Sequence, residues 1–405
     1  MYNNIKQPIV ELEPLQELYK GKLFLYLIKT FTNDCINEFN IEIFSIKKSF
    51  NRTLTNLLSS WMFYLYADYD FKNDYFFPSN YLNTISLENT LYDLCKYNIN
   101  IQNPESKINK VITNLKNNYK KQLELLDVYK KSIIFIKNKT NYTITKIIIE
   151  NKDFYKFNIS VKFTIKNKKL LNILNNILLP INIYNKLKNQ YTGPENKIDT
   201  YLWAIIYRYQ LLGSNNHQLA VLPNIMTLMK QDYNLNFECF ASSINSTFNN
   251  YCSIYYDLER FFGSIGSFFN FTPIKGTYGF NPPYQKEIIN KGIYKLLESL
   301  DNTKEELTFI ITIPIWDNLG KLTMIELYNN IKNDIDYGEF EIIEHIKSSK
   351  YFRGIRMIAK EKFTYIDHNF ELYKNKTIQN TYVIILSNQP HKLDTLNNYD
   401  FEHYT

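Results

Sequence analysis

Glycine is almost absent from the first half of this 405-residue chain, since ten of its 11 glycines lie at or after Gly193 and only Gly21 precedes it. A segment nearly free of glycine is typical of regular helical structure, whereas clustered glycine marks tight turns and close approach of the backbone to a ligand. We therefore predict a scaffold in roughly the first 190 residues and a ligand-binding unit in the rest of the chain.

Cysteine is scarce as well. The four cysteines, Cys35, Cys95, Cys239 and Cys252, have no CxxC or Cys/His spacing, which excludes a tetrahedral zinc shell and a secreted disulfide scaffold.

No apolar run approaches the length of a membrane span, and no basic region followed by an apolar stretch opens the chain. We expect a soluble intracellular protein without a bound metal or membrane segment. A nuclear or cytoplasmic address stays open, with the cytoplasm expected if a large DNA virus encodes the chain.

Arginine is also rare, with five residues among the 47 basic ones, but lysine is concentrated in one segment. Residues 101–200 carry 19 basic and 7 acidic residues, while the other 305 carry 28 and 33. Such asymmetry is expected of a surface that binds a polyanion, because Lys and Arg neutralise phosphates and release counterions. A solvated lysine-rich face is the alternative.

The spacing of apolar residues predicts three parts. Residues 1–132 repeat them every three or four positions and should form a helical domain. Residues 133–195 should form a small basic α+β module, with strands over 131–150 and 154–167 and a helix over 170–191.

Residues 196–405 show short apolar runs separated by turns, with helices near DTYLWAIIYRYQLL and YQKEIINKGIYKLLESL. We expect strands at NFECFA, YCSIYY, TYGFN, LTFIITIPIW, FEIIEHI, RGIRMIAKEKFTYI and TYVIILS. This alternation predicts an α/β fold, a Rossmann-like class I methyltransferase sheet with an antiparallel edge.

The tetrapeptide Asn281, Pro282, Pro283 and Tyr284 lies between an expected strand and an expected helix. The amino nitrogen of adenine is a poor nucleophile because its lone pair is delocalised into the ring. An Asn side-chain oxygen and a proline carbonyl can accept the two amino hydrogens, and consecutive prolines present their carbonyls rigidly. The tyrosine ring can stack on the base. A purely structural Asn-Pro-Pro turn is the alternative.

With the amine held in this way, methyl transfer needs positioning and electrostatics more than a strong base. The five histidines show no nucleophile–base pattern.

Several blocks, in order, resemble the catalytic core of the phosphorylated-CTD-interacting factor family, which comprises cap-specific adenosine N6-methyltransferases. The blocks are RYQLLGSNNHQLAVLP (208–223), FECFASSIN (237–245), YYDLERFFGSIG (255–266), FNPPY (280–284), FIITIPIW (309–316) and TYVIILSNQP (381–390). The resemblance implies S-adenosylmethionine as the cofactor and, as the substrate, 2′-O-methyladenosine beside a 7-methylguanosine cap at the 5′ end of an RNA.

The resemblance also implies roles for individual residues. Asn281 to Tyr284 would be the catalytic, cofactor-proximal loop. The cofactor would contact Ala241, Ser242, Asn245, Asp257, Phe262, Gly263, Ser264 and Asn281. In that set Asp257 would bind the ribose hydroxyls, although it could instead be a turn former and Phe262 a core residue.

Substrate contacts are implied at a further set of residues, namely Arg52, Glu287, Pro314, Trp316 and Asp317. Arg52 would clamp cap phosphates with its bidentate fork. Trp316 would stack on the cationic 7-methylguanine. Alternatively, Trp316 covers the hydrophobic core.

The chain departs from the family at several positions. Animal members carry a WW domain that binds the phosphorylated polymerase tail. Because the only tryptophans are Trp61, Trp203 and Trp316, we predict neither this domain nor that partner. Ser243 replaces a usual proline, and Lys286, beside Glu287, replaces a usual acidic residue.

Two other kinds of function are compatible with the sequence, and the first is a methyltransferase with another acceptor, such as adenine in DNA or within an RNA. Asn-Pro-Pro-Tyr also occurs in N6-adenine DNA methyltransferases and in glutamine methyltransferases of release factors, since a planar amide presents its NH2 much as adenine does. A catalytically silent cap- or RNA-binding module is the second. The oligomeric state stays undetermined.

Overall fold

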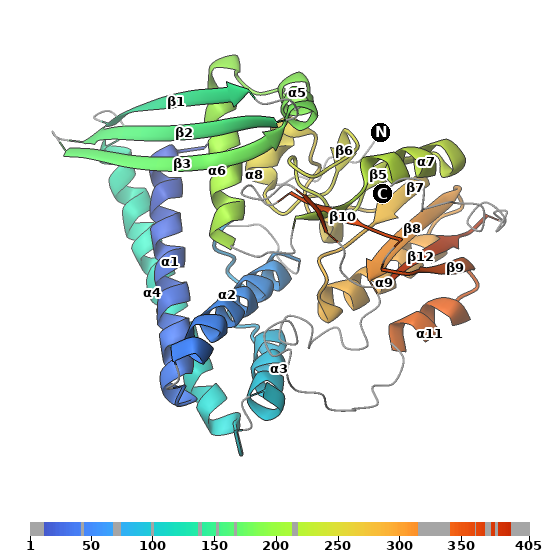
Figure 1. Cartoon of the computed structure of the whole chain (residues 1–405), viewed down its shortest axis with the longest axis horizontal. Helices are drawn as coiled ribbons and strands as arrows, with labels where there is room; N and C mark the ends of the chain where they lie inside the picture. Colours follow the sequence, from blue (N-terminus) through green and yellow to red (C-terminus); the bar gives the residue numbers. More distant parts are fainter. Residues whose placement is uncertain are drawn as a thin grey trace.

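The structure is a computed structural model of the chain (Figure 1). It describes residues 12–41, 44–67, 74–98, 101–136, 140–150, 154–165, 168–212, 218–314, 341–360, 362–368, 374–376 and 380–389.

The N-terminal part is helical, as the spacing of its apolar residues predicts. Its helices are α1 (Pro14–Glu38), α2 (Phe44–Ala67), α3 (Ile85–Asp93) and α4 (Glu105–Ile136), with a π-helical turn over Leu94–Asn98. Helices α1 and α4 lie side by side and antiparallel (Figure 1). Tyr19 stacks on Tyr129 with ring centroids 4.0 Å apart near one end, and Lys110 binds Glu38 at 2.6 Å near the other.

A separate antiparallel sheet follows, with strands β1 (Thr140–Glu150), β2 (Phe154–Ile165) and β3 (Lys168–Pro180), before helix α5 (Ile181–Gln190). Two predictions were wrong here. Residues 131–136 still belong to α4, and residues 170–180, where we expected a helix, belong to strand β3. In a short segment, apolar residues spaced three and four apart are compatible with a helix or a strand. Residues 168–180 form a strand because they pair with β2 along its whole length.

The C-terminal part begins with a 3₁₀ turn (Glu195–Lys197) and contains a six-stranded sheet flanked by helices. Its elements are α6 (Ile198–Leu212), β4 (Leu219–Val221), α7 (Pro223–Tyr233), β5 (Leu235–Glu238), β6 (Asn250–Tyr251), α8 (Tyr256–Glu259), β7 (Gly276–Phe280), α9 (Lys286–Asp301), β8 (Leu307–Pro314), α11 (Glu341–Ser348), β9 (Phe352–Ile358), β10 (Tyr365–Asp367), β11 (Lys374–Lys376) and β12 (Thr381–Ser387). Short 3₁₀ turns lie at Arg260–Phe262 and Phe268–Asn270.

The large sheet has the order β6-β5-β7-β8-β12-β9, in which β6, β5, β7 and β8 pair in parallel. Strand β12 runs antiparallel to both of its neighbours. This is a Rossmann-like methyltransferase fold, and it confirms the predicted fold class. The antiparallel strand lies inside the sheet and not at its edge, because its run Val383–Leu386 is buried on both faces.

Three further expectations differ from the structure. The segment FEIIEHI contributes to helix α11, because Ile342, Ile343 and Ile346 bury one side while Glu344 stays exposed. In YCSIYY only Tyr251 is in a strand, β6, and Tyr256 already begins α8. In RGIRMIAKEKFTYI the described residues form two strands, β9 and β10.

Apolar side chains fill both faces of the sheet. Helices α9 and α11 cover one face, with Ile289 and Ile293 at the contact, and α7 covers the other together with β4 and β10. Helix α6 packs against the N-terminal helices and shares their core through Trp203. The division into 1–132, 133–195 and 196–405 therefore stays a prediction.

No helix in the described ranges combines the length and the apolar composition that crossing a membrane requires.

Candidate active site

The carboxyl ends of β5 and β7 and the segment after β6 border one pocket of about 680 Å³. Strand β5 has β6 on one side and β7 on the other, so the pocket lies where the strand order reverses, the usual ligand site of open α/β sheets. The pocket unites seven residues that the sequence singled out, namely Ala241, Ser242, Asn245, Asn281, Pro282, Pro283 and Tyr284.

The tetrapeptide forms the turn between β7 and α9, as expected from its place between a strand and a helix. Strand β7 ends at Phe280, and Gln285 is the N-cap residue of α9. The Gln285 N–H donates to the Pro283 carbonyl at 2.7 Å. The proline segment is therefore held by a backbone hydrogen bond in addition to its fixed φ angles.

Tyr284 is hydrogen-bonded to Asn281. Its hydroxyl donates to Asn281 Oδ1 at 3.0 Å, and its ring lies edge-on against Tyr365, with centroids 6.0 Å apart and planes at 72°. Burial raises the pKa of the Tyr284 phenol, so it stays a hydrogen-bond donor over the ordinary pH range. The role that we expected for this ring, stacking on a base, stays a prediction.

The loop after β5 is held by side chains, and no helix forms between β5 and β6. Asn245 Oδ1 accepts from the Ser242 N–H at 2.6 Å, and Ser242 Oγ donates to Gln218 Oε1 at 2.9 Å. Glu259 also binds this loop. Its Oε1 accepts from the Ser243 N–H at 2.7 Å, and its Oε2 accepts from the Tyr209 hydroxyl at 3.0 Å. A proline at position 243 would lack this N–H.

Asp257 does not line the pocket. Its two oxygens accept from Arg208 at 2.8 and 2.6 Å, and Arg208 also donates to Glu17 at 2.7 and 2.9 Å. These carboxylates and the guanidinium are buried. The structure thus places Asp257 in an ion-pair network that joins α1, α6 and α8, outside the pocket lining, and its role toward the ribose stays a prediction.

The other three residues expected to contact the cofactor, Phe262, Gly263 and Ser264, are not among the lining residues of the pocket. Phe262 is fully buried in the core that includes the N-terminal helices. Gly263 has φ of +100°, a conformation that suits glycine. The Ser264 hydroxyl bonds to Ser253 Oγ at 2.7 Å, and Ser253 itself lines the pocket. Ser264 therefore reaches the pocket only through a neighbour.

The implied substrate residues are scattered. Arg52 is on α2, Glu287 is half-buried in the first turn of α9 outside the pocket lining, and Pro314 ends β8 opposite Thr381. Trp316 and Asp317 fall outside the described residues, and the side chain of Arg52 is not described either.

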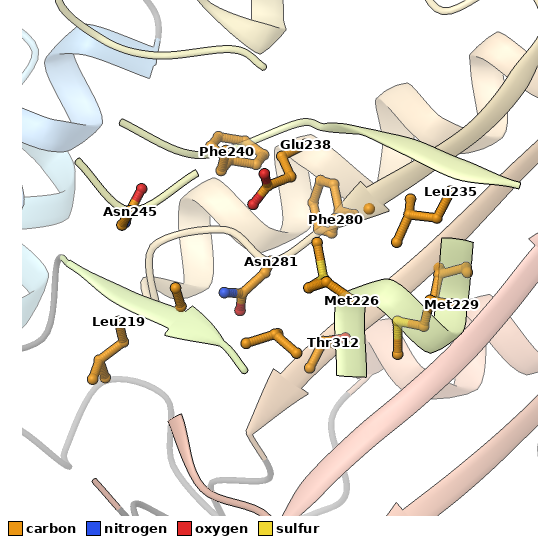
Figure 2. Close-up of a pocket in the computed structure, with 14 residues that line it drawn as sticks. Leu219, Met226, Met229, Leu235, Glu238, Phe240, Asn245, Phe280, Asn281 and Thr312 are labelled. Carbon is orange, nitrogen blue, oxygen red and sulfur yellow. The ribbon is translucent and has the colours of Figure 1, made fainter. Parts of the chain in front are cut away.

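A second pocket, of about 400 Å³, was not predicted from the sequence, and it shares Asn281 and Asn245 with the first (Figure 2). Met226 and Met229 of α7 line it, together with Glu238 at the end of β5. Figure 2 shows the Glu238 carboxylate and the Asn281 carboxamide both directed into this space.

Glu238 Oε1 accepts from the N–H groups of Thr247 and Phe248, at 2.6 and 2.9 Å. Burial raises the pKa of Glu238 to about 7, and nearby Lys186 opposes that rise. An acidic residue at the end of an apolar strand was the one signal that could have identified it.

Other lining residues were also missed. Gln218, Phe268 and Phe269 complete the first pocket from segments far apart in the sequence. Gln218 lies in the block 208–223 but was given no role, and Phe268 and Phe269 belong to none of the quoted blocks, so only the folded chain identifies them as lining residues.

The chain is similar to known proteins over this region. Residues 181–331 match the family model described as the phosphorylated CTD interacting factor 1 WW domain. The match begins with α5 and includes β4 to β8, and thus the whole described lining of the second pocket and that of the first except Phe63 of α2. It overturns our prediction that the chain lacks the WW domain, and with it the exclusion of polymerase-tail binding through that domain.

Two curated relatives, from Mus musculus and Homo sapiens, are each named mRNA (2′-O-methyladenosine-N(6)-)-methyltransferase. Each is 27% identical over 197 residues, which is 47% of this chain and 26% of the relative. The chain thus matches about a quarter of each relative's length. Over that part, this Rossmann-like chain is similar to enzymes that methylate N6 of adenosine in mRNA.

Proposed function

We propose that this chain is an S-adenosylmethionine-dependent methyltransferase that methylates N6 of the first adenosine beside the cap of an RNA. The observation that carries the proposal is the position of Asn281, at the carboxyl end of β7 and in the wall of both pockets. The names of the two relatives support the same chemistry and suggest the capped RNA substrate. An enzyme that acts on mRNA would be intracellular.

The larger pocket suits the cofactor. Bound S-adenosylmethionine supplies an electrophilic methyl group on a sulfonium sulfur. Phe240, Phe268 and Phe269 offer aromatic faces for a base or a cationic sulfur, and Ser253 and Ser267 offer hydroxyls for polar groups. No Lys or Arg is among the described residues that line this pocket, so the protein places no cationic side chain beside the sulfonium.

Asn281 and the prolines would hold the acceptor amine. Asn281 Oδ1 would accept one amino hydrogen, and the carbonyl of the adjacent Pro282 would accept the other. Both contacts draw the amino group out of conjugation and direct its lone pair at the methyl group. The rate then depends on position and on fixed dipoles, which a side-chain amide and a rigid backbone carbonyl supply.

The test is nucleoside mass spectrometry after incubation with S-adenosylmethionine and four substrates: capped RNA that begins with 2′-O-methyladenosine, its uncapped form, RNA with internal adenosines, and DNA. We expect methyl gain on the capped RNA alone and a loss of at least about 100-fold in Asn281→Ala. Exposed Asn302→Ala, at the far end of α9, is the matched control and should keep full activity.

Each other outcome replaces part of the proposal. Gain on DNA or on internal adenosines keeps the chemistry but changes the substrate. If no substrate gains a methyl group although calorimetry detects cofactor binding, the acceptor is of another class, such as a glutamine side chain. Binding of capped RNA without cofactor binding would identify a silent cap-binding module.

A further inference from the structure

A line of hydroxyl groups runs from strand β12 to Asn281. Thr381 Oγ1 lies 3.1 Å from the Tyr365 hydroxyl, the Tyr365 and Tyr284 hydroxyls are hydrogen-bonded to each other, and the Tyr284 hydroxyl donates to Asn281 Oδ1 at 3.0 Å. Thr381 and Tyr365 are fully buried. Neither lines either of the two pockets described above, and the line reaches Asn281 through Tyr284.

The direction of these bonds matters because a carboxamide has two different ends. If Asn281 rotates by half a turn about its last side-chain bond, Nδ2 takes the place of Oδ1, and its hydrogens face the amino hydrogens of an incoming adenine. A phenol cannot prevent this rotation alone, since its oxygen accepts from Nδ2 as readily as its hydrogen donates to Oδ1.

The neighbouring hydroxyls remove this ambiguity when their hydrogen bonds run in one direction, from Thr381 to Tyr365 to Tyr284, and either direction fits the contact between Thr381 and Tyr365. When Tyr365 donates to the Tyr284 oxygen, the Tyr284 hydrogen is left to point at Asn281, and only Oδ1 can receive it. The Thr381 hydroxyl can donate to the Tyr365 oxygen and so leaves the Tyr365 hydrogen for Tyr284. One Oδ1 lone pair then faces Tyr284, and the other is available to the pocket.

We propose that Tyr365 and Thr381 are positioning residues, which fix the Asn281 carboxamide through Tyr284 with its oxygen as the acceptor for the amino group to be methylated. The inference rests on the proposed function, since it specifies how that site presents its acceptor. The two residues that it adds to the site, Tyr365 and Thr381, belong to β10 and β12, strands that lie about 80 to 100 residues after the tetrapeptide.

Steady-state kinetics of Tyr365→Phe and Thr381→Val provide the test, with whichever of the four substrates the protein methylates. Both variants keep the shape of the side chain and remove its hydroxyl. We expect kcat to fall roughly five- to tenfold in Tyr365→Phe and less in Thr381→Val, with the cofactor dissociation constant within about twofold of wild type. Tyr278→Phe is the matched control, because this buried hydroxyl donates to the Lys275 carbonyl outside the line and should leave kcat unchanged.

The Asn281→Asp variant distinguishes a positioning role of Tyr365 from a role in the stability of the fold alone. A carboxylate has an oxygen at both ends, so its rotation changes nothing for the acceptor amine. In the Asn281→Asp background, adding Tyr365→Phe should therefore alter kcat by less than about twofold. A structural defect would instead raise the cofactor dissociation constant and lower the midpoint of thermal unfolding in either background.

The inference is overturned if the wild-type protein is active and Tyr365→Phe keeps its full kcat, or if Tyr365→Phe costs the same factor in both backgrounds. Absence of methyl transfer by the wild-type protein on all four substrates would instead overturn the proposed function.

Discussion

Arg208 donates two hydrogen bonds to Asp257, at 2.8 and 2.6 Å, although the two residues are 49 positions apart. The same guanidinium binds Glu17 of α1, and Lys20 joins Glu17 to Asp74 at 2.8 and 3.1 Å. This network joins the N-terminal helices to the segment that carries Ser253 into the pocket. Burial of so many charges is tolerated because each is paired.

Asp257→Asn should destabilise the protein by about 3–5 kcal/mol, because it leaves the Arg208 charge buried and only partly compensated. Urea unfolding followed by circular dichroism measures this change. Lys350→Met, which breaks an exposed pair with Asp301, should leave the unfolding midpoint unchanged. A normal free energy of unfolding combined with a weaker cofactor affinity would restore the ribose-binding role of Asp257.

Glu259→Gln should weaken cofactor binding roughly tenfold while leaving kcat nearly unchanged. Glu259 holds the Ser243 N–H and hydroxyl at 2.7 and 3.1 Å, and its carboxylate shapes the loop that carries Ser242 and Asn245. Isothermal calorimetry with S-adenosylmethionine measures the affinity. Glu298→Gln, an exposed change on α9, is the control, and equal affinities in both variants would show that the loop does not depend on Glu259.

Glu238 should make stability depend on pH. Burial raises its pKa from 4.5 to about 7, so the folded protein binds a proton here that the unfolded chain releases above 4.5. The contribution of this proton to stability is complete below pH 4.5 and is lost as pH rises through 7. The loss should reach at most about 1.4 kcal/mol per pH unit, and Lys186 should reduce it.

The measurement is urea unfolding of the wild type and Glu238→Gln at several values from pH 5 to pH 8. The wild type should lose stability relative to the variant across this interval. A difference that is constant with pH would mean that Glu238 stays ionised in the folded protein.

The basic segment should bind RNA through phosphates. Lys168→Glu with Lys169→Glu, at the start of β3, should weaken capped RNA binding at least about threefold and reduce the slope of log affinity against log salt by roughly one unit. Fluorescence anisotropy at several salt concentrations measures both. Lys304→Glu, an exposed change outside the segment, should have a smaller effect, and equal effects would favour a merely solvated lysine-rich face.

The fold class and the position of the catalytic candidate follow from the amino-acid sequence alone. Apolar periodicity is a local property, and so is the strand–Asn-Pro-Pro-Tyr–helix order, which is why local residue patterns suffice to put Asn281 at the end of a strand. The same locality explains the clustering of Ala241, Ser242 and Asn245 with it, since the carboxyl ends of neighbouring parallel strands meet at one edge of a sheet.

The other features depend on tertiary contacts. Residues 168–180 form a strand because β2 offers a partner along its length, and Asp257 lies outside the pocket lining because Arg208, which also binds Glu17 of α1, holds it. Tyr365 stands behind Tyr284 because β10 packs on the face of the sheet that α7 covers. Such partners lie tens to hundreds of residues away in the chain, and hydrogen bonds and ion pairs between them form only once burial has brought them together.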